Sequence, residues 1–256
     1  MSERAQPRVV VITAGGTREP IDDVRYVSNA ATGQLPAAIA DVLLRQGHTV
    51  HYIHGPEAVL PGHARLNVDV RELTADQLRE RTAAWLAQAL ALQSELTGHL
   101  HLHPIHTALE VTQTLQVLCA RLQPDAVACA MAVADFAPVA STGKLSSRRD
   151  VLELHMTATQ KAIDIVKAAA PRTHLLGFKL LSHASEAELL EAGLRLIQRA
   201  GADAVFCNDM ADLQRGVRRG LVLGASGTIV ARLDGGTGAP GLADLAAGIV
   251  RHGLPV

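Results

Sequence analysis

Four short segments of this 256-residue chain carry glycines and polar residues of the types that bind phosphate groups. The first segment, residues 12–20, contains Gly15 and Gly16, where the backbone can turn tightly and bring N–H groups against an anion. The second, residues 24–33, leads into an expected helix at Gly33, and the free N–H groups of a helix N-terminus favour phosphate. These two segments predict an anion site.

The other two segments add charge and an aromatic ring. Asp135 follows a run of small residues, where its carboxylate could reach Mg²⁺ or a ligand hydroxyl, and Lys144 lies in a Gly/Ser loop from which it could reach a triphosphate. Phe178 and Asn208 follow two further apolar runs, and the Phe178 ring could stack on a base. Each of these residues also has an ordinary interpretation as a turn, surface or core residue. Their combination is what indicates a nucleotide site.

The elements that must position these segments alternate between strand-like and helix-like patterns. Strands are predicted at residues 8–13, 49–53, 66–70, 126–132, 152–156, 175–179, 204–207, 221–223 and 228–233. Helices are predicted at residues 33–46, 74–96, 107–122, 160–169, 185–200 and 241–251. This alternation predicts an α/β fold, a Rossmann-like three-layer α/β/α sandwich with a mainly parallel central sheet, in one domain of residues 1–256. Ligands of such sheets bind at the carboxyl ends of the strands.

Composition argues against several functional classes. The chain has 24 Lys and Arg against 25 Asp and Glu, so it lacks the basic surplus of a nucleic-acid-binding protein. Aromatic residues are only 2%, too few for base-stacking platforms. No apolar run reaches the ~18 residues of a membrane span, and the polar start is no signal peptide. We expect a cytoplasmic protein that binds neither nucleic acid nor a membrane.

The cysteines and two glycine motifs do not indicate further chemistry. Cys119, Cys129 and Cys207 are far apart in sequence, which is typical of reduced, mostly buried thiols. Residues 236–241 spell GxGxxG, but only 15 residues follow, too few for a dinucleotide-binding unit. Leu145 after Lys144 departs from the Walker A pattern, and no Tyr–Lys pair at the required spacing supports a nicotinamide oxidoreductase.

Taken together, the four segments resemble the phosphopantothenoylcysteine synthetase family, which joins 4′-phosphopantothenate to cysteine in coenzyme A biosynthesis. The family's motifs occur in order as TAGGTREP, VRYVSNAATG, AMAVADFAP, KLSS, GFKLLS and CND. The resemblance covers about residues 8–210, and the KLSS and GFKL forms look most like the stand-alone bacterial synthetases. It implies a homodimer, Mg²⁺, and CTP in preference to ATP as co-substrate.

The resemblance also implies a role for each matching residue. Asn29, Lys144 and Asp135 would form the catalytic set, with Asn29 holding the acyl intermediate and Lys144 neutralising the triphosphate. Arg25 would reach in from a neighbouring subunit to grip the phosphate of phosphopantothenate. The implied nucleotide-binding residues are Gly15, Gly16, Thr32, Gly33, Phe178 and Asn208. The implied substrate-binding residues are Arg25, Asn29, Ala132 and Asp135.

The implied reaction is a ligation in two steps. The carboxylate of phosphopantothenate attacks the α-phosphate of the nucleotide, giving an acyl-nucleotidylate and pyrophosphate. The amine of cysteine then attacks the activated carbonyl and releases the nucleoside monophosphate, leaving 4′-phospho-N-pantothenoylcysteine. Because two anions must meet, the site needs cations and helix-end N–H groups, and Arg195 and Arg199 are further candidates to contact phosphate.

Some positions depart from the family pattern. Gln34 stands where Lys or His is common, Ala31 replaces a usual Ser, and Pro36 has no N–H to offer a phosphate. Residues 157–161 replace a segment usually holding Lys and Pro, although Lys161 retains one charge. The alternative hypothesis is therefore a catalytically degenerate relative that binds nucleotide or phosphopantothenate without turnover.

A histidine string lies within residues 75–110, which look like an insertion. In an extended segment, His99, His101 and His103 would project to one side, close enough to share a metal ion. The string contains no cysteine or carboxylate, however. A solvated loop between two helices is the interpretation that the sequence favours.

Overall fold

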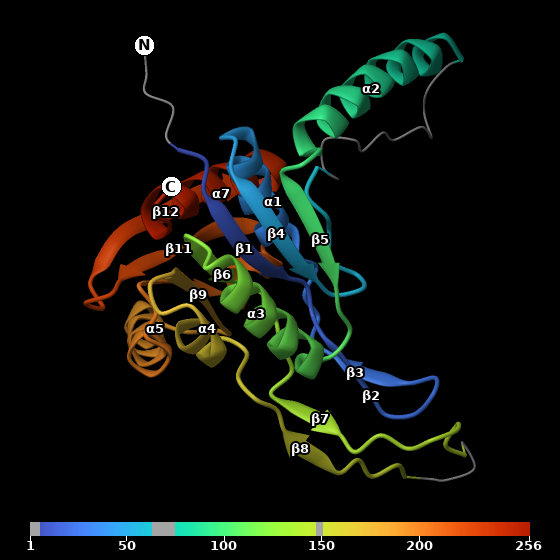
Figure 1. Cartoon of the computed structure of the whole chain (residues 1–256), viewed down its shortest axis with the longest axis vertical. Helices are drawn as coiled ribbons and strands as arrows, with labels where there is room; N and C mark the ends of the chain where they lie inside the picture. Colours follow the sequence, from blue (N-terminus) through green and yellow to red (C-terminus); the bar gives the residue numbers. More distant parts are fainter. Residues whose placement is uncertain (1–5, 63–74, 147–150) are drawn as a thin grey trace.

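The computed structural model describes residues 6–62, 75–146 and 151–256, so the strand predicted at residues 66–70 lies outside the described residues. One sheet in the order β12-β11-β10-β9-β6-β1-β4-β5 organises the chain (Figure 1). From β10 to β5 neighbouring strands pair in parallel, whereas β11 and β12 are antiparallel. The strand bounds are β1 (Val9–Ala14), β4 (Thr49–His54), β5 (Leu100–Pro104), β6 (Ala126–Cys129), β9 (His174–Leu181), β10 (Ala204–Asp209), β11 (Val217–Gly224) and β12 (Ile229–Thr237).

Helices cover both faces of this sheet. Helices α1 (Gln34–Arg45) and α7 (Gly238–Gly253) pack on one face, and α3 (Ala108–Leu122), α4 (Asp164–Ala169) and α5 (Glu186–Ala200) pack on the other (Figure 1). In β1, Val10 and Ile12 belong to the first core and Val11 to the second, because successive strand side chains alternate between faces. The predicted α/β/α sandwich with a mainly parallel sheet is confirmed.

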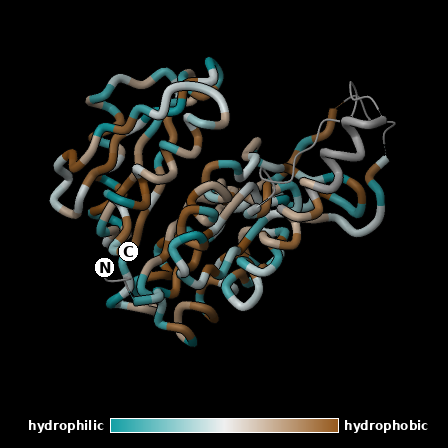
Figure 2. Tube along the Cα trace, turned by 90° about the horizontal axis from the view of Figure 1, so that it is seen from above, coloured by the Kyte–Doolittle hydropathy of each residue, from teal (hydrophilic) through white to brown (hydrophobic). Residues whose placement is uncertain are grey.

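Hydropathy follows these layers. Hydrophobic residues concentrate in the strands of the sheet, and hydrophilic residues are frequent in the outer loops (Figure 2). Strands of a parallel sheet are buried on both faces, so they read as apolar runs in sequence. This is why the predicted strands of the central sheet agree with the observed ones within a few residues.

Local capping sets the ends of several helices. Thr107 accepts from the N–H of Glu110 at the start of α3, and Ser185 forms a capping box with Glu188 at the start of α5. These side chains replace the bonds that the first turn of a helix cannot make internally. At the end of α1, Gly47 adopts a left-handed φ of 83°, a conformation that glycine commonly provides just after the last turn of a helix.

Two short ribbons differ from the sequence prediction. Strand β2 (Arg18–Pro20) pairs with β3 (Tyr26–Ser28), and β7 (Phe136–Pro138) pairs with β8 (Met156–Ala158). The strand predicted at residues 152–156 is therefore displaced to β8 and lies outside the central sheet. The strand predicted at residues 126–132 ends at Cys129, where the chain leaves the sheet at the carboxyl ends of its parallel strands. Both ribbons lie beyond the carboxyl ends of the parallel strands (Figure 1).

The remaining helices are α2 (Ala75–Leu96) and the short α6 (Met210–Gln214). Helix α2 projects away from the sheet beyond the start of β5 (Figure 1). None of the helices in the described ranges has both the length and the hydropathy needed to cross a bilayer.

Candidate active site

A cleft of about 1290 Å³ opens at the carboxyl ends of β1, β6, β9 and β10. Its wall includes seven of the eleven site residues that the resemblance implies: Gly15, Thr32, Gly33, Ala132, Asp135, Phe178 and Asn208. Strand ends that are distant in sequence meet here because the strands are parallel neighbours in the sheet. The fold thus brings all four polar segments to one place.

The glycines of the first two segments are closely packed against neighbouring atoms. Gly15 has a φ of 81°, and a Cβ atom there would lie 2.7 Å from the Cβ of Ala58. Gly33 has a φ of 71° and faces the same alanine. Gly16 is outside the lining; a Cβ there would lie 2.6 Å from the carbonyl oxygen of Asn29. Two glycines therefore shape the cleft, and the third allows the Asn29 loop to approach.

The amino end of α1 opens into the cleft beside these glycines. Gly33 is its N-cap without a side-chain hydrogen bond, and the first turn of α1 carries no acidic residue. Its N–H groups and positive dipole end are therefore not neutralised within the helix. Pro36 also lines the cleft and offers no N–H, as the sequence indicated.

Asn29 lies at the rim rather than in the lining. Its side-chain amide donates a hydrogen bond to the carbonyl oxygen of Ala132, 3.1 Å away. Ala132 is also bridged to Gly16 in parallel register, so the first three polar segments meet at this point.

Arg25 and Lys144 lie on two loops that contact each other. Arg25 Nη2 donates to the carbonyl oxygen of Leu145 at 2.8 Å, and the buried carboxylate of Asp22 accepts from the N–H of Leu145 at 3.1 Å. The Lys144 side chain is exposed. Neither Arg25 nor Lys144 lines the cleft in this chain, but the two loops that carry them are bonded to each other.

Cations missed or only partly foreseen in the sequence also line the cleft. Lys161 forms an ion pair with Asp135, and Arg195 and Arg199 project from α5. Arg218 comes from β11, and its Nη2 atom lies 3.5 Å from the side-chain oxygen of Gln34. The Arg218 Nε atom is buried without a hydrogen-bond partner among the described residues. No motif marks Arg218, because β11 is antiparallel and follows the last recognised segment.

Phe178 both packs on the core and faces the cleft. Its ring centroid lies 5.8 Å from that of the fully buried Phe206, with the ring planes at 60°. This tilted contact is a favourable geometry for an aromatic pair, and it fixes the orientation of the Phe178 ring. The core and stacking interpretations of Phe178 are thus compatible.

The thiols are poorly suited to nucleophilic chemistry. Cys119 and Cys207 are buried, and desolvation raises the pKa of each to about 11. Cys129 lines the cleft, and desolvation likewise raises its pKa above the ordinary value. With raised pKa values, these cysteines remain protonated near neutral pH. They are poor nucleophiles in that form, because the thiolate is the reactive species.

The histidine string is part of the central sheet, so its interpretation as a solvated loop is wrong. Residues 100–104 form the edge strand β5, and the rings of His101 and His103 stack on His51 of β4 at 4.5 Å and 5.3 Å. His51 Nδ1 lies 3.0 Å from His103 Nε2. Among the described residues, no three His, Cys, Asp or Glu side chains are arranged to hold a metal ion. His99 precedes the strand.

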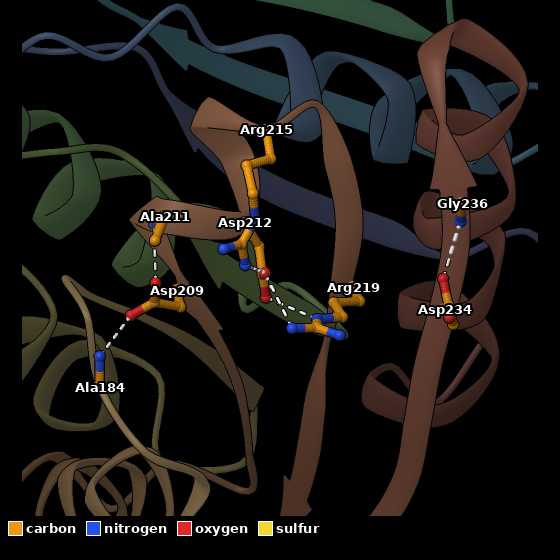
Figure 3. A network of polar contacts seen from close by, with 8 residues as sticks. All are labelled: Ala184, Asp209, Ala211, Asp212, Arg215, Arg219, Asp234 and Gly236. Atoms are coloured by element: carbon orange, nitrogen blue, oxygen red, sulfur yellow. Dashed lines mark hydrogen bonds and ion pairs between the residues drawn. The ribbon is translucent and has the colours of Figure 1, made fainter.

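A polar network lies at the end of β10, the strand that carries Asn208 (Figure 3). The next residue, Asp209, accepts from the N–H groups of Ala184 and Ala211, both at 2.8 Å. Asp212 accepts from Arg219 Nε at 2.6 Å and also pairs with Arg215. The hydrogen bond from Arg219 is the main reason that the pKa of Asp212 lies below its ordinary value. Helix α6 is thereby fixed beside the cleft.

Comparisons with known proteins agree with this fold. A family model described as the DNA/pantothenate metabolism flavoprotein C-terminal domain matches residues 5–93 and 86–221. The coenzyme A biosynthesis bifunctional protein CoaBC of Thermococcus kodakarensis is 31% identical over 208 residues, which are 78% of this chain and 41% of that protein. CoaBC of Mycobacterium tuberculosis is 33% identical over 117 residues, 43% of this chain and 28% of that protein. The chain thus spans less than half the length of these curated relatives.

Solved structures share the architecture at low sequence identity. The DNA/pantothenate metabolism flavoprotein from Streptococcus pneumoniae superimposes with a TM-score of 0.72 at 22% identity, covering 95% of this chain and 97% of that one. A Cab2 mutant in complex with phosphopantothenate-cysteine gives a TM-score of 0.74 at 20% identity, covering 96% of this chain and 86% of that one. These similarities establish the fold.

Proposed function

The chain belongs to the DNA/pantothenate metabolism flavoprotein C-terminal domain family, and from this premise we propose that it is a phosphopantothenate–cysteine ligase. The observation that carries the proposal is the convergence of Gly15, Gly33, Asp135, Phe178 and Asn208 on one cleft. These residues offer candidate contacts for a triphosphate, a stacked base and an acyl phosphate. The relative CoaBC of T. kodakarensis is named for coenzyme A biosynthesis, which supports this choice of substrates.

In the first step, the carboxylate of phosphopantothenate attacks the α-phosphate of the nucleotide, and pyrophosphate leaves. Both reactants are anions, so the protein must offset their repulsion. The N-terminus of α1, whose N-cap is Gly33, and the cations Lys161, Arg195 and Arg218 line the cleft for this task. Lys144, whose loop is bonded to the Arg25 loop, would add a further positive charge at the triphosphate.

In the second step, the amine of cysteine attacks the activated carbonyl, and negative charge develops on the carbonyl oxygen. One N–H of the Asn29 amide is used by Ala132, so the other remains to donate to that oxygen. A neutral amide stabilises this charge without binding phosphate more tightly in the ground state. The raised thiol pKa values support a direct attack by the substrate amine rather than a protein cysteine.

The residues present fit a magnesium ion carried in with the nucleotide. Mg²⁺ is usually held by one or two carboxylates together with substrate phosphates, and Asp135 is the carboxylate in the described lining of the cleft. The ion would neutralise charge on the triphosphate. Asp135 would hold it, and Lys161, its present partner, would then turn toward phosphate oxygens.

We further propose that the active protein is a homodimer. Val24 and Tyr26 of the β2–β3 ribbon, Phe136 of β7 and Val139 just after it are each about half exposed or more. The two ribbons extend from the same end of the molecule (Figure 1), where these apolar side chains would cost free energy if left in water. A second copy placed there would lie close to the Arg25 loop.

The test is pyrophosphate release by the purified protein with 4′-phosphopantothenate and Mg²⁺, comparing CTP with ATP, with and without cysteine. Turnover that requires cysteine, with CTP preferred, supports the ligase. A folded protein that binds nucleotide but yields neither pyrophosphate nor product would identify the degenerate relative instead. Sedimentation of wild type and Phe136→Ser tests the dimer, since loss of the apolar ring should shift the protein toward monomer.

A further inference from the structure

Asp22 is a buried carboxylate to which neither the motifs nor the proposed reaction assigns a role. Its side chain is fully buried, between the loop that carries Arg25 and the loop that carries Lys144. Oδ1 accepts from the N–H groups of Val24 and Arg25 at 2.9 and 2.8 Å. Oδ2 accepts from the N–H of Leu145 at 3.1 Å and lies 3.7 Å from Arg25 Nη1.

The peptide groups of Leu145 are held on both sides. Its N–H donates to Asp22, and its carbonyl oxygen accepts from Arg25 Nη2 at 2.8 Å. Two backbone bonds run alongside, from Ser141 N–H to the oxygen of Ile21 at 3.0 Å and from Asp23 N–H to the oxygen of Gly143 at 3.5 Å. Lys144 lies within this paired stretch, so the backbone from which its side chain extends has a fixed position.

Turn formation alone does not account for these contacts. An aspartate that caps its own turn needs only the bonds to Val24 and Arg25, which are two and three residues ahead. The bond to Leu145 spans 123 residues, and the bond from Arg25 to Leu145 spans 120. Both carboxylate oxygens are needed, one for each loop. An amide or a hydroxyl could serve the turn but not the junction.

We propose that Asp22 is a positioning residue that sets Lys144 relative to Arg25. The inference rests on the proposed function of these two cations, as the ones that bind the triphosphate and the substrate phosphate. By joining their loops, Asp22 couples the two phosphate-binding groups, so that a shift of either loop moves both.

The first experiment tests the contact between the two loops without measuring enzyme activity. The chain has lysines only at positions 144, 161, 167 and 179, so a lysine-specific protease and mass spectrometry identify cleavage after Lys144. In the full-length protein, Asp22→Asn should speed this cleavage about tenfold, because local opening no longer breaks the bond to Leu145. Asp23 is an exposed carboxylate in the same loop, so Asp23→Asn is the matched control. This variant should be cleaved at the wild-type rate. Equal rates in all three proteins would overturn the proposal.

The second experiment asks whether Asp22 acts through Lys144. Asp22→Asn should lower kcat for pyrophosphate formation by about tenfold, and far less when Lys144 is already Ala, because coupled residues are not additive. Effects that multiply in the double variant contradict the proposal. Asp22→Ser, whose hydroxyl can still cap the turn, replaces Asp22→Asn if the latter does not fold. A wild-type protein without turnover refutes the ligase function. The cleavage rates still test whether Asp22 joins the two loops.

Discussion

The side-chain amide of Asn29 donates a hydrogen bond to the main-chain carbonyl of Ala132, although 103 residues separate the two in sequence. The bond fixes the amide at the rim of the cleft and leaves its second N–H without a partner among the described residues. Asn29 is exposed, so a bound substrate can reach that N–H without displacing core residues.

Replacing Asn29 by Ala should impair the second step more than the first. Removing one donor to a developing oxyanion typically slows a reaction by about 10²-fold or more. We expect near-normal pyrophosphate release in a single turnover without cysteine, and ligation slowed by about 100-fold. Rapid-quench measurement of both products checks this. An equal loss in the two steps would contradict the assigned role, and an unchanged melting temperature would exclude misfolding as the cause.

Replacing Arg218 by Gln should weaken nucleotide binding. The guanidinium lines the cleft, and its Nε atom has no partner among the described residues, so a bound anion is its natural acceptor. Losing one charge-assisted hydrogen bond costs about 1.5–3 kcal/mol, so Kd should rise about tenfold or more. Isothermal titration with CTP measures it. Arg232→Gln, on the neighbouring strand and paired with Glu186, is the control and should leave Kd unchanged.

Replacing Gly15 by Ala should destabilise the fold more than the same change at Gly47. Both glycines have a left-handed φ, 81° and 83°, so both substitutions incur about 1–2 kcal/mol of backbone strain. A Cβ at Gly47 meets nothing within 4 Å, whereas at Gly15 it lies 2.7 Å from the Cβ of Ala58. Urea unfolding of the two variants isolates this clash, and equal losses of stability would show that Ala58 moves aside freely.

Stability should fall in acid partly through Asp212. Hydrogen bonds from Arg219 and Arg215 hold its pKa below the ordinary value of 3.8, so folding favours the ionised form. The stability it contributes is therefore complete above that value and is lost as the pH falls through the lower, folded-state pKa.

Denaturant unfolding at several pH values between about 5 and 3 measures this loss. Asp212→Asn should be less stable than wild type at pH 7 but lose less stability over that range. Asp244→Asn, a carboxylate on α7 outside this network, provides the comparison. Identical slopes for Asp212→Asn and wild type would contradict the prediction.

The extent of sequence-based prediction differs between the layers of the fold. Strands such as β1 and β4 are buried on both faces, so their apolar runs mark them without knowledge of their neighbours. Edge strand β5 has one strand neighbour and polar side chains, so its sequence resembles a loop. The ribbons β2–β3 and β7–β8 pair locally outside the sheet and leave no apolar pattern.

The sequence by itself determined the alternation of strands and helices, and the order of motifs that places Gly15, Gly33, Asp135, Phe178 and Asn208 at strand ends. These features depend on local spacing and on residue type, which a linear pattern records. Only the tertiary structure decided that Arg218 lies against Gln34, that His51 stacks on His101 and His103, and that Asp22 joins the Arg25 and Lys144 loops. Such contacts depend on strand order and register, which are set by packing across the whole sheet and are not recorded in the spacing along any one segment.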